Sequence, residues 1–546
     1  MNDDVQERVG CLYYRKCTEN GSVIEQSQTY NPINLKPQLP IERRVSKRSI
    51  LFGRWYQRLM RGESAVGISL PNWFASNAVA TYFVALIIVN VMFLNYGTEW
   101  YFMLFGIAWV MGFFYLSRNL SISWSVAKIR TPKLFEKKLF LTSFLIRAVY
   151  VFFSYFFYQG MHGNPFEFSA ADSMGYTELA EDWALYFEND TLGQILMDIA
   201  QHGVSDMGFP LFLLIPTILF WEGAIIVSRL LLSLLGAYTA VLIYRLARRS
   251  MDETTARISA IFCALHPVLI CYAGMSLKEV LMTFLTVWFI ERADSLLRNK
   301  QYKFGTVIPV LLIGLSLFFF RTVLGMVAFM AVLFSLLMID THVVSIGRKI
   351  AIGITVVLFI LLAASDRIMN EVHEITNTDI RAQQRISMTA RYGSEKGGRR
   401  GGGNKFANYA GAAVFAPLIF TIPFPTMVVA EGQEDMRLIH GGNWVRNIMS
   451  GLVILAMVML LLSGDWRQYT LPLSMMLGYL VMLVFTQFAH SLRFHIPTIP
   501  FEMLFAAYAL THMRRKHKRW YLYWCLFMIV TCVAWNWFKL AGRGLV

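Results

Sequence analysis

The sequence has few charged residues, which make up 16% of its 546 positions, whereas hydrophobic residues make up 56%. Soluble domains carry about 25% charged residues, and a soluble fold could not bury this much apolar surface. Cysteine is also scarce, and the six cysteines show neither zinc-ligand nor redox spacing. These scarcities argue against a soluble enzyme, a zinc protein and a domain held by disulfides.

Several short motifs are also missing. The sequence contains no G-x-x-x-x-G-K-[ST] phosphate loop, no H-E-x-x-H zinc motif and no glycine-rich dinucleotide fingerprint between a strand and a helix. The N-terminus lacks a basic segment followed by a short apolar core and a small-residue cleavage site, so we predict no cleaved signal peptide. The first hydrophobic segments are therefore expected to act as internal anchors.

What the sequence does have is a series of apolar runs of about 17 to 25 residues, long enough for a helix to cross a hydrocarbon core of about 30 Å. We predict an all-α fold, a polytopic transmembrane bundle of about thirteen spans with extracytoplasmic juxtamembrane helices. The expected spans are residues 76–96, 99–117, 139–158, 224–246, 256–274, 277–292, 305–320, 322–339, 348–365, 443–463, 469–487, 496–512 and 519–538.

The formal net charge of +15 comes mostly from short basic stretches beside apolar segments. This pattern indicates membrane topology rather than nucleic-acid binding. By the positive-inside rule we place the basic stretches in the cytoplasm, and they are residues 43–61, 118–138, 245–249, 292–303 and 514–519. The N-terminus is then inside, and the acidic loop 159–207 is outside.

The predicted organisation has four parts. These are a cytoplasmic tail (1–74), two extra spans with a basic cytoplasmic linker (75–138), a core (139–512) with outer loops 159–207 and 366–442, and a basic cytoplasmic loop with a final span (513–546).

The stretch 366–410 does not fit the positive-inside rule, because it is basic yet the predicted topology places it outside the cytoplasm. To keep the later spans in phase, residues 411–430 must be re-entrant or interfacial, and Pro417, Pro423 and Pro425 disfavour a regular spanning helix there. If residues 411–430 cross the membrane, every later basic cluster lies on the opposite side of the membrane from the one predicted.

In the first outer loop, Asp172, Tyr176 and Ala180 have helical i, i+4, i+8 spacing and would share one face of a short helix. A carboxylate facing a cavity at the membrane surface could act as a general base that takes a proton from an attacking hydroxyl. The alternative is that Asp172 caps an interfacial helix, since Asp is a favoured N-cap residue. The spacing alone favours the cap.

Three sequence features together resemble the GT-C glycosyltransferases. The first is the Asp-x-x-x-Tyr-x-x-x-Ala pattern in the first large outer loop, and the second is MGFPLFLLIP, from Met207, followed by a span ending in YRLARR. The third is HSLRFHIPTIP, from His490, with its Arg-x-x-x-Pro-x-x-Pro pattern. Among the GT-C enzymes, the sequence most resembles the lipid A aminoarabinose transferases and the protein O-mannosyltransferases.

The resemblance implies that Asp172 is the catalytic base and that a second acidic residue lies in the next outer loop. Glu279 is the carboxylate in the short AGMSLKE segment, where it could orient the acceptor or share a divalent metal ion with Asp172. Lys278 could pair with a phosphate. The alternative is an ion pair between Lys278 and Glu279 or at the helix end, and the sequence leaves both open.

Substrate binding is expected from Tyr176 and from basic residues at the outer ends of spans. Arg321, in FFFRTVLG, could clamp a lipid phosphate through two hydrogen bonds, and Arg493 with its neighbours His490 and His495 is placed similarly. The alternative for each residue alone is snorkelling to lipid headgroups. Arg147, Arg229 and Glu222 also lie in or near apolar segments, and the sequence assigns them no role.

The resemblance implies an enzyme of the inner (plasma) membrane with its active site on the periplasmic side. It would transfer a sugar from a polyprenyl-phosphate-linked donor to a glycan, lipid or protein acceptor. The missing nucleotide-sugar domain agrees with a lipid-linked donor. Two alternatives remain: an O-antigen or exopolysaccharide polymerase, and a lipid-linked sugar transporter or flippase, which should show broken midplane helices in paired repeats.

Overall fold

The chain divides into the units Met1–Phe52 and Gly53–Val546. The computed structural model describes residues of the second unit: 69–189, 191–202, 206–298, 304–338, 424–429, 434–485, 491–514, 518–541 and 545–546, with positions 347, 350, 353 and 354. Over these ranges the chain forms helices and no strand, apart from one isolated bridge between Gly97 and Val428. The predicted all-α class is confirmed.

Among the described residues, six helices are long and apolar enough to cross a membrane. They are α3 (Asn72–Met92), the continuous run Trp100–Ser123, α6 (Pro132–His162), α10 (Ala224–Ser250), α21 (His440–Ser463) and α25 (Lys518–Ala541). The run Trp100–Ser123 consists of α4 (Trp100–Met111), η2 (Gly112–Leu116) and α5 (Ser117–Ser123). The polytopic membrane class is confirmed, whereas the count of about thirteen spans stays a prediction.

Shorter helices complete the described fold. They are η1 (Leu94–Tyr96), α7 (Ala171–Glu188), α8 (Leu192–His202), α9 (Gly208–Phe220), η3 (Trp221–Gly223), α11 (Glu253–Leu265), α12 (Pro267–Cys271), η4 (Tyr272–Gly274), α13 (Glu279–Arg298), α14 (Phe304–Phe318), α15 (Thr322–Met338), α20 (Glu434–Leu438), η6 (Asp465–Tyr469), α22 (Thr470–Phe485), α23 (Leu492–His495), η7 (Ile496–Thr498) and α24 (Ile499–His512). The expected span 348–365 lies outside the described residues, apart from positions 350, 353 and 354. Within 411–430 the structure describes only 424–429, which are not helical.

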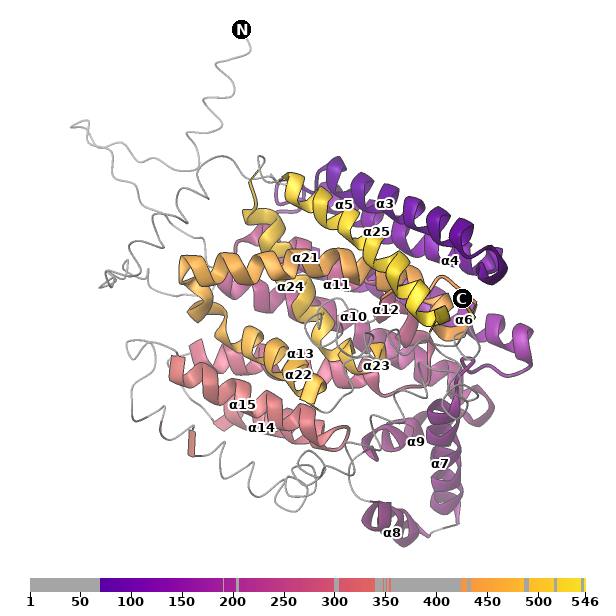
Figure 1. The fold of residues 1–546 in the computed structure, drawn as a ribbon. Helices are drawn as coiled ribbons and strands as arrows, with labels where there is room; N and C mark the ends of the chain where they lie inside the picture. The colour runs from indigo at the N-terminus through magenta and orange to yellow at the C-terminus, as the bar shows by residue number, and fades with distance from the viewer. Residues whose placement is uncertain are drawn as a thin grey trace, which may run out of the picture. The chain divides into compact units, whose positions relative to one another are not determined.

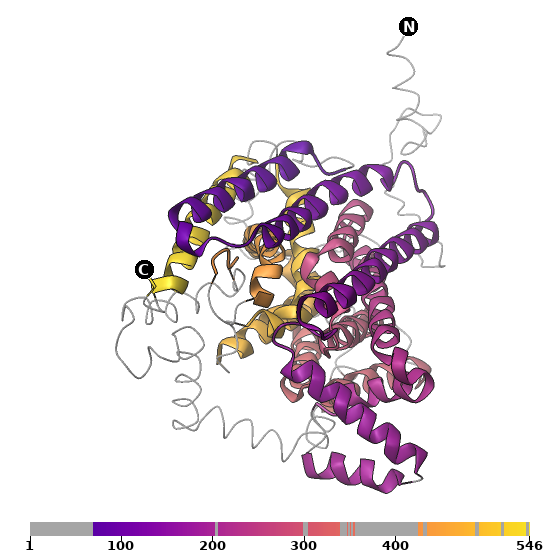
Figure 2. The ribbon, with the colours of Figure 1, turned by 90° about the vertical axis from the view of Figure 1, so that its right-hand side faces the viewer.

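Helix α10 lies in the middle of the bundle and packs against α6, α11 and α13. Helix α24 packs against α11 and α21, α15 packs against α22, and α3 lies beside α25 (Figures 1 and 2). Small residues permit the closest contact, because a Cβ atom on Gly441 of α21 would lie 2.5 Å from the carbonyl oxygen of Gly106 on α4. The described helices therefore pack into one helical core.

The predicted span 256–274 is broken, since α11 and the segment Pro267–Gly274 meet at an angle of 49°. Pro267 cannot donate a backbone hydrogen bond, and His266 before it has extended backbone angles. Arg147 of α6 donates to the carbonyl oxygen of Ala264 at 2.8 Å and to that of Cys263 at 3.5 Å. This buried arginine thus binds carbonyl groups at the end of α11, as irregular backbone at membrane depth requires.

Two of the predicted basic stretches meet at one end of the bundle. Arg249, near the end of α10, pairs with Glu291 at 2.6 Å and Asp294 at 2.9 Å, both near the end of α13. Arg298 donates to the carbonyl oxygen of Gln468 in η6 at 2.8 Å. Helices α7 and α8, from the acidic loop 159–207, and α9, which follows it, lie beyond the opposite end of α10 (Figure 1). The bundle therefore separates these basic stretches from the acidic loop.

Candidate functional site

The two predicted carboxylates meet at a single arginine. Arg493 of α23 donates from Nη1 to Asp172 Oδ2 and from Nε to Glu279 Oε1. Asp172 lies in the first turn of α7 with 57% of its side chain exposed, whereas Glu279, the first residue of α13, is 1% exposed. Although burial opposes the arginine's charge, Glu279 and Asp172 raise the pKa of Arg493 above its ordinary value.

Asp172 is not the cap of its helix. The N-cap residue of α7 is Ala170, which makes no side-chain cap bond, and the Asp172 carboxylate bonds Arg493 instead. Its negative charge still favours the N-terminal turn of α7. Buried Ala180 and Trp183 hold α7 in place on its inner face. The structure therefore favours the interpretation of Asp172 as a site residue, although its catalytic role stays a prediction.

Lys278 does not pair with its neighbour Glu279. Its Nζ donates to Asp206 Oδ1 and to the carbonyl oxygen of Phe320 at 3.4 Å, and it lies 5.8 Å from the centre of the Tyr176 ring. Burial lowers the pKa of Lys278, and Asp206 opposes this shift. For Tyr176 burial has the opposite effect and raises the pKa. Tyr176, Lys278 and Glu279 thus lie close together, and their roles as site residues stay predictions.

Asp206 is a site residue that the sequence analysis missed. Its φ of 71° lies in the left-handed region, where Asp is tolerated better than most residues. Gly208, the first residue of α9, donates a backbone hydrogen bond to the carbonyl oxygen of Phe319 at 3.0 Å. A Cβ atom on residue 208 would lie 2.9 Å from the Phe320 ring, so glycine permits this close approach. The signal was the acidic residue directly before the Met-Gly-x-Pro-Leu motif.

The structure places the other predicted substrate-binding residues, Arg321, His495 and His490, differently from one another. Arg321 lies beside the site, because its Nη1 donates to the Tyr479 hydroxyl at 3.1 Å and its guanidinium lies 4.1 Å from the ring centre of Phe494. His495 is fully buried, and its Nδ1 accepts a hydrogen bond from Arg446 at 2.9 Å, so it faces the helix core. His490 lies outside the described residues.

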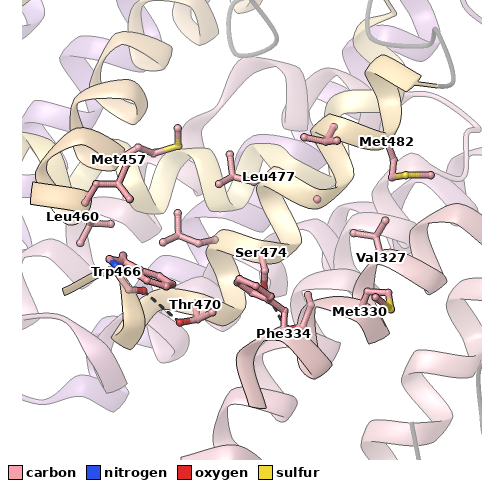
Figure 3. Close-up of a pocket in the computed structure, with 15 residues that line it drawn as sticks. Val327, Met330, Phe334, Met457, Leu460, Trp466, Thr470, Ser474, Leu477 and Met482 are labelled. Carbon is pink, nitrogen blue, oxygen red and sulfur yellow. Dashed lines mark hydrogen bonds between the residues drawn. The ribbon is translucent and has the colours of Figure 1, made fainter. Parts of the chain in front are cut away.

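An apolar groove of about 610 Å³ runs between α15, α21 and α22 (Figure 3). Val327, Met330 and Phe334 of α15 line one wall, and Leu477 and Met482 of α22 line another (Figure 3). Arg321 directly precedes α15 and its partner Tyr479 lies on α22, although neither residue lines the groove. The groove and this cationic group therefore share the helices α15 and α22.

A shared metal ion fits this arrangement poorly. The guanidinium of Arg493 takes the place that a cation would occupy between Asp172 and Glu279. In the part of the chain that the structure describes, no three His, Cys, Asp or Glu side chains are grouped to hold a metal. The metal stays a prediction from the sequence, and the chemistry that these residues support passes through none.

One comparison with known proteins found a match, to the C-terminal part of the chain. Residues 440–540, from α21 to α25, match the profile of the Alg9-like mannosyltransferase family. The matched stretch includes Arg493 but neither Asp172 nor Glu279. No curated protein and no solved structure matches the chain. The family match bears out the resemblance that the motifs predict: residues 440–540 are similar to a family of membrane glycosyltransferases of the GT-C type, and the described residues include six helices long and apolar enough to cross a membrane.

Proposed function

We propose that the protein transfers a sugar from a polyprenyl-phosphate-linked donor to a glycan, lipid or protein acceptor on the extracytoplasmic face. The observation that carries this proposal is the convergence of Asp172, Glu279 and Arg493 from three separate helices, beside Lys278 and Arg321. This group lies at the opposite end of α13 from the basic stretch that the positive-inside rule assigns to the cytoplasm.

The donor's phosphate is bound by Arg321 and Arg493, and its hydrocarbon chain lies in the groove of α15, α21 and α22. Arginine suits this role, because its planar guanidinium can give two parallel hydrogen bonds to phosphate. The groove supports the proposal because it is lined by apolar side chains (Figure 3) and lies on α15 and α22, the helices next to Arg321 and its partner Tyr479. A polyprenyl chain placed there leaves its sugar beside the carboxylates.

Transfer then needs a base for the acceptor hydroxyl. Asp172 takes the hydroxyl proton while the acceptor oxygen forms a bond to the sugar's anomeric carbon. The bond between that carbon and the phosphate oxygen breaks, and the lipid phosphate leaves with the electron pair. Arg321 and Arg493 stabilise the negative charge that develops on it. Because the phosphate competes with Asp172 for Arg493, donor binding frees the carboxylate to act.

The transporter alternative has one observation in its favour, the broken pair of α11 and Pro267–Gly274. Transporters of that kind carry such breaks in paired repeats. The described helices include one bent pair, and Arg147 binds the carbonyl groups at its break. We therefore keep the broken helix as a structural feature of the enzyme. The polymerase alternative differs only in its acceptor.

The sidedness can be tested by cysteine labelling in a variant that lacks Cys11 and Cys17, since the four other cysteines are buried. Leu192→Cys, on the exposed face of α8, should react with a membrane-impermeant maleimide in intact cells. Lys128→Cys, in the basic linker, is the control and should react only after permeabilisation. Labelling in the reverse order would place the site in the cytoplasm.

Arg321→Ala should weaken donor binding by about 10-fold to 100-fold, because a hydrogen bond to a charged group contributes about 1.5–3 kcal/mol. Binding of a polyprenyl-phosphate sugar to the purified protein measures this. Arg467→Ala is the matched control, since this exposed arginine stacks on Trp466, which lines the groove. Parental affinity in Arg321→Ala would reduce Arg321 to a lipid-headgroup contact.

A further inference from the structure

A second buried polar group lies next to the carboxylates, and the chemistry above does not use it. It consists of Glu167, Ser173, Arg229 and Ser276, here called the Arg229 cluster. Their exposed fractions are 5%, 0%, 0% and 1%. A charged arginine with no exposure at the start of a membrane helix is costly and calls for a specific role.

The Arg229 cluster contacts both segments that lead into the site. Arg229 Nε donates to Ser276 Oγ at 3.2 Å, and Ser276 belongs to the short segment that ends in Lys278 and Glu279. The guanidinium also lies 5.6 Å from the ring centre of Phe166. Next to Phe166, Glu167 accepts a hydrogen bond from Ser173, the neighbour of Asp172. Arg229 on α10 thus contacts the segment before Glu279 directly, and it contacts Phe166, the neighbour of the Glu167 that binds next to Asp172.

The cluster also has hydrogen-bonding capacity that the described residues do not fill. Arg229 Nη1 and Nη2 and Glu167 Oε2 are buried without a partner in that part of the chain. Buried polar groups are nearly always paired in stable folds, and exceptions are concentrated where function requires them. Burial raises the pKa of Glu167, which Ser173 and the positive charge of Arg229 oppose.

We infer that Arg229 and Glu167 are positioning residues, which hold Asp172 and Glu279 at the separation that one arginine can bridge. This inference rests on the proposed function. Arg493 contacts the two carboxylates through Nε and Nη1, whose spacing is fixed by the planar guanidinium. If the Ser276 contact or the Glu167–Ser173 contact shifts, Glu279 or Asp172 moves away from the reacting atoms. Helix α10, packed on three sides, is the rigid base from which Arg229 acts.

The inference predicts that Arg229→Met lowers kcat by about 100-fold, the typical cost of a misplacement of about 1 Å. The KM for the donor should change little, because Arg321 and Arg493 remain. Arg147→Met is the matched control: Arg147 is equally buried, but it bonds Ser143 and the end of α11 rather than the site. It should lower the yield of folded protein and leave kcat per folded molecule near the parental value.

A double-mutant cycle with Asp172→Asn separates positioning from general stability. If Arg229 acts by placing the base, Arg229→Met should cost much less in the Asp172→Asn background than in the parent. Equal fold-losses in both backgrounds, or a loss matched by Arg147→Met, would overturn the inference. The proposed function fails separately, through a parental rate in the Asp172→Asn single variant.

Milder changes keep the test decisive if Arg229→Met does not fold. Ser276→Ala removes one hydrogen bond to Arg229, and Glu167→Gln keeps the size of the side chain while removing its charge. Both should lower kcat more than they raise the donor KM, and Arg229→Lys should retain more activity than Arg229→Met because it keeps the positive charge. Parental kcat in both Ser276→Ala and Glu167→Gln would also overturn the inference.

Discussion

Asp172→Asn should slow sugar transfer by about 100-fold to 10,000-fold, the range expected for loss of a general base. The substitution keeps the size of the side chain and removes the oxygen that would take the proton. The protein should stay folded, since the Asp172 side chain is 57% exposed and exposed ion pairs contribute little to stability. The measurement is the transfer rate of the purified variant with a polyprenyl-phosphate sugar.

The matched control is Asp182→Asn, which makes the same change at an exposed position of the same helix. It should transfer sugar at the parental rate. A folded Asp172→Asn protein with parental activity would remove Asp172 as the base, and Glu279 would be the next carboxylate to test. If Glu279→Gln were active as well, the base would have to come from elsewhere in the chain.

The members of this site could be predicted from sequence more easily than their contacts. Asp172 lies in the Asp-x-x-x-Tyr-x-x-x-Ala pattern, Glu279 is the carboxylate of the next short loop, and Arg493 lies in the motif that begins at His490. Their meeting depends on how α7, α13 and α23 pack, and the sequence does not encode that packing locally. The same limit explains Asp206, whose importance comes from its contact with Lys278.

The positions of the membrane helices were predictable because apolar runs reflect the thickness of the membrane, although α6 (Pro132–His162) extends beyond the expected 139–158 at both ends. The break of α11 was not predicted, although the dipeptide His266-Pro267 is a local signal for it. His495 was assigned to substrate because it follows Arg493 in a motif. A histidine two positions along a short helix points in another direction, and here it faces Arg446.

Arg446 and Glu502 form a fully buried ion pair between α21 and α24. Their side chains are 0% and 1% exposed, and two hydrogen bonds of 3.0 Å and 2.8 Å join them. Thr498 donates to the same carboxylate at 2.8 Å, and Arg446 also donates to His495. Because Arg493 precedes His495 on α23, the pair helps to fix the helix that presents Arg493 to the site.

Glu502→Gln should destabilise the protein by about 3–5 kcal/mol, since it leaves the positive charge of Arg446 buried without its counter-charge. Denaturation of the purified protein in detergent measures this loss. Glu136→Gln is the control: Glu136 also binds an arginine, Arg245, through two hydrogen bonds, but the side chains are 20% and 35% exposed. Screening by water should keep that cost at about 0–1 kcal/mol.

A double change of Arg446→Met and Glu502→Leu distinguishes stability from positioning. Replacing a buried ion pair by apolar residues of similar volume is often neutral or stabilising by about 1–4 kcal/mol, so the double variant should regain the stability that Glu502→Gln loses. It should not regain full activity, because His495 loses its partner and α23 its fixed position. Equal stability of Glu502→Gln and the parent would contradict the first expectation, and full activity of the double variant would contradict the second.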